Sequence, residues 1–249
     1  MDFQLSTSIF NLNGDTRLSK WQLRFYKYAN LLNNSFPNLF LDHNLKLEKF
    51  HLSPEKLESF WLNIDPASSP SRALSNLFWL SLPWPKIKKD LGGAINVRAV
   101  GCGSGNYGQF LTNKAGADIA SYTGTDFSEN TNWKNLEKDF PNFHFFRADS
   151  ANILSHIPNQ TNLFISQSAI EHFRSDLTFF RQINKFIEVA SHPTLQIHLF
   201  PSAACLPLYG AHGFRQYTPK TVSRITRLFL HSKHSRRPTS ILYFLGSLH

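Results

Sequence analysis

The segment AVGCGSGNYGQFL, residues 99–111, places dense glycine directly after a short apolar run. Gly103, Gly105 and Gly108 satisfy the pattern G-x-G-x-x-G. A glycine turn between a strand and a helix lets a ligand approach the backbone and points helix N–H groups at it. Asp126 ends the second apolar run, where a carboxylate can accept hydrogen bonds from both ribose hydroxyls. Together, the glycine loop and Asp126 predict a nucleoside or nucleotide site. The alternative is a plain glycine turn followed by an Asp126 that only caps a helix.

Two later segments add polar residues after further apolar runs. In FRADSANIL, Asp149 follows a third expected strand, where a short polar side chain can hold an adenine amino group. In NLFISQSAIEHF, a fourth expected strand leads into Glu171 and His172, at the edge where open α/β sheets bind ligands. A histidine there is a candidate general base for an acceptor hydroxyl. The alternative is that Glu171 and His172 only cap and orient the loop.

The loop LPLYGAHGFRQYTP, residues 206–219, follows the fifth expected strand and carries a second set of polar and aromatic side chains. An arginine can pair with a phosphate or carboxylate, and tyrosines can stack on a sugar or a ring. The candidates for acceptor binding are Tyr209, His212, Arg215 and Tyr217. A well-packed loop is the alternative. The remaining histidines have no metal-ligand spacing, so no metal site is predicted.

Short apolar runs alternate with helical stretches from residue 96 onward, which predicts βαβ units and a mostly parallel sheet. The expected fold is a three-layer α/β domain over residues 91–249. The expected strands are NVRAV, SYTGT, FHFF, NLFIS and TLQIHLF, and the expected helices are YGQFLTNKA, SENTNWKNLEKD and DLTFFRQINKFIEVA; the tail adds the helix TPKTVSRITRLFL and the apolar run TSILYFL.

Residues 1–90 predict a helical cap or lid. Ser53 is a candidate N-cap before Pro54, and SSPSRALSNLFWLSLPW predicts a second helix. Pro83 and Pro85 should end that helix, and KIKKDLGG is interpreted as a linker.

The net charge of +9 is a local feature. No Asp or Glu follows Glu188, while the same stretch holds seven cations: Arg215, Lys220, Arg224, Arg227, Lys233, Arg236 and Arg237. The rest of the chain is nearly neutral, with 19 Lys and Arg against 17 Asp and Glu. Such a patch suits RNA, anionic lipid head groups or phosphorylated substrates, or is simply solvated. Cys102 and Cys205 are interpreted as free thiols in a reducing, cytoplasmic compartment, and no apolar run is long enough to span a bilayer.

Four of these segments, in order, resemble the class I S-adenosylmethionine-dependent methyltransferases. AVGCGSG is similar to the latter half of that family's loop, hydrophobic-x-Asp-x-Gly-Cys-Gly-x-Gly, and YTGTDFSEN, FRADSANIL and NLFISQSAIEHF are similar to its following segments. The resemblance covers about residues 95–200. Ala99 stands where the family usually has an acid, and Asn162 where an Asp often opens the fourth strand. The resemblance implies S-adenosyl-L-methionine as cofactor, held by Gly101, Gly103, Gly105, Tyr107, Asp126, Phe127, Asp149, Ser150 and Gln167.

The resemblance implies methyl transfer to an oxygen atom, with a small molecule or a saccharide as acceptor. LYGAHGFRQYT is also faintly similar to methyltransferases of bacterial surface-polysaccharide synthesis. Four alternatives stay open: an RNA methyltransferase that uses the basic C-terminal region, a catalytically silent binding protein, a nicotinamide-dependent dehydrogenase, and a basic tail that contacts an anionic membrane.

Overall fold

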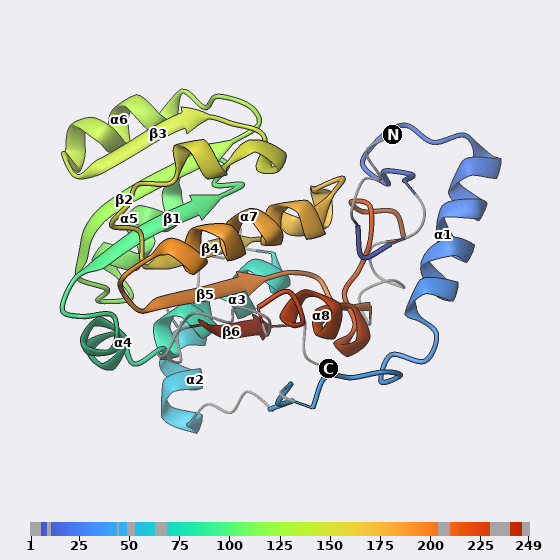
Figure 1. Ribbon diagram of the computed structural model, residues 1–249, viewed down its shortest axis with the longest axis horizontal. Helices are drawn as coiled ribbons and strands as arrows, with labels where there is room; N and C mark the ends of the chain where they lie inside the picture. The colour runs from blue at the N-terminus through green and yellow to red at the C-terminus, as the bar shows by residue number, and fades with distance from the viewer. Residues whose placement is uncertain are drawn as a thin grey trace.

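The computed structural model describes residues 6–8, 11–43, 45–48, 53–62, 69–203, 210–229 and 240–245. Its centre is a six-stranded sheet in the order β3-β2-β1-β4-β5-β6, and every neighbouring pair is parallel (Figure 1). The strands are β1 (Ile95–Val100), β2 (Ile119–Asp126), β3 (Phe143–Arg147), β4 (Leu163–Gln167), β5 (Thr194–Leu199) and β6 (Ser240–Leu245). The chain is a three-layer Rossmann-like α/β fold, as its alternating pattern predicts.

Helices cover both faces of this sheet, and each face has its own apolar core. One core joins α3 (Pro70–Ser81), α4 (Trp84–Asp90) and α5 (Asn106–Asn113) to alternate residues of β1, β4 and β5. The other joins α7 (Asp176–Val189) and α8 (Pro219–Thr226) to the opposite face. The remaining helices are α1 (Lys20–Asn34), α2 (Pro54–Leu62), α6 (Asn132–Asp139) and the short 3-10 helices η1 (Ser150–Asn152), η2 (Leu154–His156) and η3 (Ile170–His172).

The prediction that residues 86–93 form a linker is wrong for most of that stretch. The helix α3 does end just before Pro83, but Pro85 lies in the first turn of α4, which runs to Asp90. Proline suits that position because the first helical N–H groups have no partner within the helix. Trp84 and Ile87 of α4 pack in the same core as Ile95, so the packing is continuous across the expected domain boundary at residue 90.

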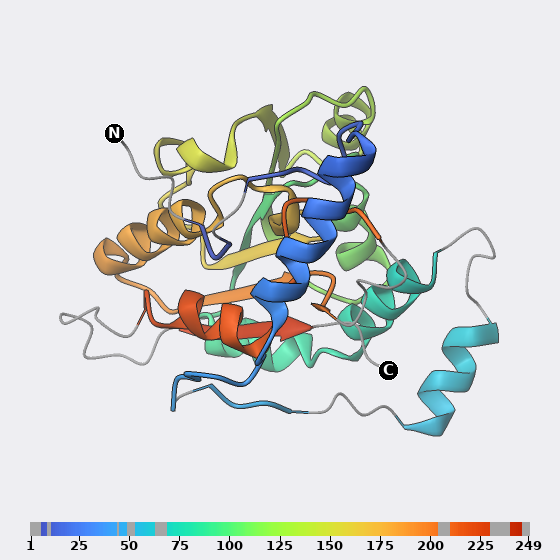
Figure 2. The same ribbon diagram turned by 90° about the vertical axis from the view of Figure 1, so that its right-hand side faces the viewer.

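The N-terminal helix α1 crosses the carboxyl-end side of the sheet as a separate layer (Figure 2). Its buried side chains are Tyr26 and Asn30, and the Tyr26 hydroxyl donates to the carbonyl of His212 at 2.6 Å. The N-terminal segment is therefore fastened to the loop that follows β5. Within the described ranges, no helix combines the length and apolar character needed to cross a membrane.

Four of the seven C-terminal cations belong to the described residues, and each donates to backbone carbonyls. Lys220, Arg224 and Arg227 bind the carbonyl oxygens of Ser35, Thr7 and Phe40, respectively. Arg215 binds those of Phe173 and Arg174. Much of the charge that suggests a polyanion partner therefore holds the N-terminal segment and the loop after η3 in place. Lys233, Arg236 and Arg237 lie outside the described residues.

Candidate functional site

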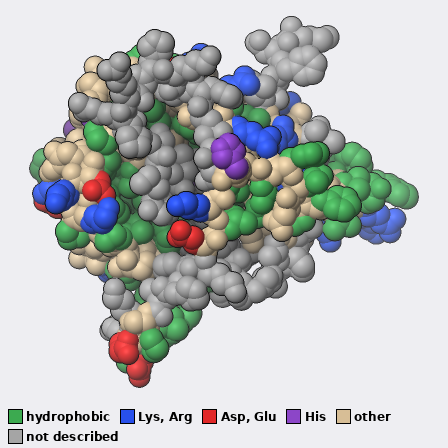
Figure 3. Space-filling model, turned by 60° about the horizontal axis from the view of Figure 1, so that its bottom comes forward, with side chains coloured by type: hydrophobic (Ala, Val, Ile, Leu, Met, Phe, Trp, Pro, Cys, Tyr) green, Lys and Arg blue, Asp and Glu red, His purple; other side chains and the backbone are tan. Residues whose placement is uncertain are grey.

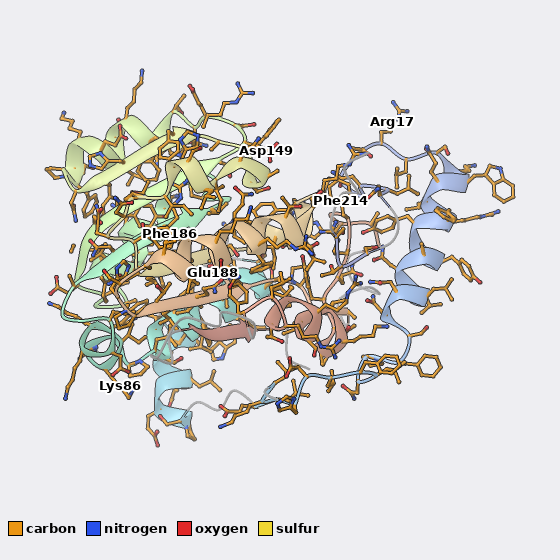
Figure 4. All side chains as sticks on the ribbon, in the orientation of Figure 1. Arg17, Lys86, Asp149, Phe186, Glu188 and Phe214 are labelled. Atoms are coloured by element: carbon orange, nitrogen blue, oxygen red, sulfur yellow. The ribbon has the colours of Figure 1, made fainter. Side chains whose placement is uncertain are left out.

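A pocket of about 1040 Å³ lies at the carboxyl ends of the strands. It spans the crevice between β1 and β4, where the strand order reverses and where open α/β sheets bind ligands. Asp149 and Phe214, which both line it, lie beyond this end of the sheet, whereas Lys86 lies at the opposite end (Figure 4). Of the predicted cofactor residues, eight line the pocket: Gly101, Gly103, Tyr107, Asp126, Phe127, Asp149, Ser150 and Gln167.

The glycines of the loop serve different purposes. A side chain at Gly105 would collide with Phe145 and Leu136, and one at Gly108 with Phe143 and Tyr122. These two glycines therefore let the loop and α5 pack closely against β2, β3 and α6, and Gly105 does not line the pocket. Gly103 differs, because a side chain there would meet nothing within 4 Å. Its bare backbone, with φ +53°, is open to a ligand.

Asp126 is directed at this open backbone. Its Oδ2 accepts a hydrogen bond from the Gly103 N–H at 2.9 Å, and its Oδ1 accepts one from the Ser128 N–H at 3.2 Å. Trp133 supports the loop from the other side by donating from its indole to the Gly103 carbonyl at 2.8 Å. The carboxylate and the open glycine thus lie together at the pocket wall, as predicted from their spacing.

The Asp149 side chain forms a hydrogen bond within its own segment of the chain. Its Oδ1 accepts from the Ala151 N–H at 2.8 Å and caps η1. Phe127 is 65% exposed beside the pocket, with the Arg147 guanidinium over its ring. Both therefore border the pocket with surface left for a ligand.

The helix α3 forms a wall of the pocket, and none of its pocket residues was predicted from the sequence. The Trp79 indole donates to Gln167 Oε1 at 2.7 Å, the Gln167 amide donates to the Tyr107 hydroxyl, and that hydroxyl donates to Asn76 Oδ1 at 3.1 Å. This chain ties α3 to β4 and to α5 across the pocket. Burial raises the pKa of Tyr107, so its hydroxyl stays protonated and keeps its donor role.

At the other side of the pocket, four ionisable side chains form what we call the carboxylate–histidine ring: Asp15, Glu171, His172 and His212. His172 Nδ1 lies 2.5 Å from Asp15 Oδ2, and its Nε2 lies 3.7 Å from Glu171 Oε1. His212 repeats the arrangement, with distances of 3.5 Å and 3.6 Å to the same two carboxylates. Each imidazole thus lies between two acids, and the two rings are 4.7 Å apart.

The electrostatics of the ring follow from this alternation. The contact with the Glu171 carboxylate, together with the charge of Asp15, raises the pKa of His212 against the opposing effect of burial. For Asp15, burial raises the pKa, but the Gly213 N–H and the two histidines lower it further, so the net change is downward. Glu171 is fully buried, and neither of its carboxylate oxygens has a hydrogen-bond partner.

Two predicted acceptor-binding residues do not reach the pocket. Arg215 and Tyr217 are buried, and neither lines the pocket. Both contact the buried carboxylate of Asp176: the Tyr217 hydroxyl donates to it at 2.8 Å, and the Arg215 guanidinium lies 3.4 Å away. They serve the core because a buried acid needs charged and hydrogen-bonding partners. His212 does line the pocket, and Tyr209 lies outside the described residues.

Ala99 and Asn162 are the two positions at which the chain departs from the family's usual pattern. Ala99, where that family has an acid, lines the pocket, and α3 places Arg72 at the same pocket. Asn162 accepts from the Asn96 N–H at 2.8 Å and donates to the Ala94 carbonyl at 2.8 Å, a pair of bonds that an ionised Asp cannot make.

Burial, reinforced by the charge of Asp126, raises the pKa of the free Cys102 thiol to about 12, which leaves it unreactive.

Asp15 was not predicted as a site residue, because nothing in its local sequence indicates that it lies in the pocket region. It lies 157 positions before His172. The chain matches no known protein-family model and no curated protein.

Proposed function

We propose that this protein is an S-adenosylmethionine-dependent methyltransferase that acts on a hydroxyl of a small molecule or saccharide. The observation that carries the proposal is the contact between the open backbone at Gly103 and the Asp126 carboxylate, at the wall of a pocket on the strand-order switch. A nucleoside fits this arrangement, because its sugar hydroxyls donate to a carboxylate while its body lies against bare backbone.

The residues of the pocket have the types needed to hold such a cofactor. Asp126 would accept from the ribose hydroxyls, and Asp149 with Ser150 would border the base. Arg72, which also lines the pocket, offers a cation for the carboxylate of the methionine portion. The cofactor supplies a methyl group on a positively charged sulfur. The volume of about 1040 Å³ is slightly above the roughly 300–1,000 Å³ of small-molecule sites, which leaves room for an acceptor.

Methyl transfer is an in-line displacement, so the main tasks of the protein are alignment and exclusion of water. The tie between Trp79, Gln167 and Tyr107 holds one wall of the pocket rigidly. The carboxylate–histidine ring lies at another wall and receives the proton that a hydroxyl acceptor releases. Within the ring we assign this role to His172, whose Nδ1 is held by Asp15 at 2.5 Å.

One observation favours a second candidate, a dehydrogenase that binds a nicotinamide dinucleotide. The all-parallel order β3-β2-β1-β4-β5-β6 is that of dinucleotide-binding domains. Such enzymes need a substrate domain, whereas the described residues after β5 add α8 and β6 to the same fold. The methyltransferase is therefore the stronger candidate.

RNA as the acceptor is less favoured. The described C-terminal cations are engaged by backbone carbonyls. On the face in Figure 3, the described Lys and Arg side chains are interspersed with apolar and polar ones. A phosphate track needs cations that are free to meet phosphates.

Calorimetry with S-adenosylmethionine and with NAD tests the proposal. We expect S-adenosylmethionine to bind in about the micromolar range and NAD to give no heat. Asp126→Ala should weaken this binding by roughly tenfold to hundredfold, because hydrogen bonds to a charged group contribute about 1.5–3 kcal/mol. Asp139→Ala is the matched control, since Asp139 is exposed and does not line the pocket. Heat with NAD alone, or unchanged binding in Asp126→Ala, would reject the assignment.

A further inference from the structure

The carboxylate–histidine ring has a feature that a simple proton acceptor does not need. A lone general base requires one imidazole and one acid to orient it. Here two imidazoles and two carboxylates alternate, and all four side chains lie within 3.7 Å of their neighbours in the ring. Asp15, His172 and His212 each offer one ligand atom, and these three atoms lie within 4.8 Å of one another.

The backbone is built to bring these residues together from three distant segments. The Gly213 N–H donates to Asp15 Oδ1 at 3.0 Å, and the Phe214 N–H donates to the Glu171 carbonyl at 2.7 Å. Gly14 allows the closest approach, because a side chain there would lie 2.5 Å from the backbone nitrogen of His212. The ring is thus fixed by main-chain contacts rather than by the chance meeting of flexible side chains.

Glu171 supplies an independent indication of a ligand. It is fully buried, yet both its carboxylate oxygens lack a hydrogen bond. A buried carboxylate is costly unless it is paired and hydrogen-bonded. Its Oε1 lies 3.6 and 3.7 Å from the Nε2 atoms of His212 and His172, slightly beyond hydrogen-bond distance. A histidine that binds a metal through one nitrogen commonly donates the other N–H to a carboxylate, and Glu171 is placed to accept from both rings.

We propose that Asp15, His172 and His212 bind one divalent transition-metal ion, with Glu171 accepting hydrogen bonds from both imidazoles. Two imidazoles and one carboxylate suit zinc or a neighbouring first-row metal. The ion takes the place of the hydrogen bond between Asp15 and His172, and an imidazole of His172 that binds it no longer acts as the general base. Each of the three ligand side chains is about one-third exposed, at 36%, 33% and 33%, so an ion can enter from solvent.

The site resembles catalytic metal sites, in which three protein ligands leave one coordination position open for water or substrate. His172 and His212 line the pocket, so that position faces the space where an acceptor would bind. The chemical class of acceptor that this favours is a hydroxyl or carboxylate oxygen. Ion binding does not rest on methyl transfer, and it is measured without the cofactor.

The experiment is a zinc titration of the full-length protein after treatment with EDTA and dialysis. We expect one equivalent of zinc by calorimetry, a higher melting temperature in its presence, and X-ray absorption with nitrogen and oxygen ligands at about 2.0–2.1 Å. Glu171→Gln should weaken binding by about 10- to 100-fold. Asp15→Asn and His212→Gln, which keep side chains of similar size, should weaken it more.

Two control variants separate this site from other histidines. His144→Ala removes an exposed histidine of β3, and the double variant His231→Ala/His234→Ala removes the histidines of the C-terminal HSKH sequence. Both should keep the wild-type stoichiometry and affinity. The proposal is overturned if the wild-type protein takes up no zinc, if Asp15→Asn and His212→Gln bind it unchanged, or if the double variant loses it. Failure of S-adenosylmethionine binding alone would overturn only the methyltransferase proposal.

Discussion

Asp176→Ala is expected to lower the free energy of unfolding by about 3–5 kcal/mol, because it strands a buried cation. Asp176 is fully buried at the start of α7. Its carboxylate accepts from the backbone N–H of Thr7 at 2.9 Å, from the Thr7 hydroxyl at 2.5 Å and from Tyr217 at 2.8 Å. It also lies 3.4 Å from the Arg215 guanidinium, which is itself fully buried.

The measurement is urea unfolding followed by circular dichroism and tryptophan fluorescence. Asp118→Ala is the matched control: it removes an exposed acid paired with Lys88, and such pairs contribute about 0–1 kcal/mol. Domains of this kind have only about 5–15 kcal/mol of stability, so a loss of this size requires a second variant that stays folded. The double variant Asp176→Leu/Arg215→Met is that second variant. Because it removes both charges, it should recover much of the lost free energy of unfolding. A midpoint for Asp176→Ala equal to that of Asp118→Ala contradicts the expectation.

His172→Ala is expected to reduce turnover at saturating cofactor by about 10²- to 10⁴-fold, the usual contribution of a positioned general base. The affinity for S-adenosylmethionine should stay near that of the wild type, because His172 lies on η3, whereas Gly103 lies in the loop after β1 and Asp126 is the last residue of β2. Transfer of a radiolabelled methyl group, with an acceptor found by screening sugars and nucleotide sugars, provides the assay.

His144→Ala serves as the control, since His144 is exposed on β3 and does not line the pocket. Unaltered turnover in His172→Ala would remove this residue from the mechanism. Comparing the wild-type protein with and without EDTA then separates the two roles of the ring. Turnover that survives EDTA assigns His172 as a base, whereas turnover that returns only with zinc assigns it as a ligand.

The sequence predicted the strands and helices of the sheet domain closely because local physics dictates them. Apolar runs of strand length alternate with helical stretches and turns from residue 96 to residue 200. The pairing of the glycine loop with Asp126 was also predictable, because parallel strands bring their carboxyl ends to one edge. Pro85 was ambiguous, since proline both ends a helix and suits the first turn of the next one.

Polar residues of one loop can lie in the core or at the pocket, and only the tertiary structure distinguishes the two cases. Arg215 and His212 lie in the same loop, yet the first pairs with buried Asp176 and the second lines the pocket. The direction of each side chain depends on segments far away in the chain, such as the one containing Thr7. The same holds for the basic C-terminal quarter, where Arg224 meets a carbonyl 217 positions earlier.

The sequence by itself determined the α/β fold, the edge at which a ligand would bind, and the glycine–carboxylate pair at that edge. The tertiary structure alone decided that Asp15 joins Glu171, His172 and His212 in one ring. The physical reason is range: apolar periodicity and turn chemistry act between near neighbours, and a single chain records them directly. A polar cluster depends on contacts between segments about two hundred residues apart, and these exist only after folding.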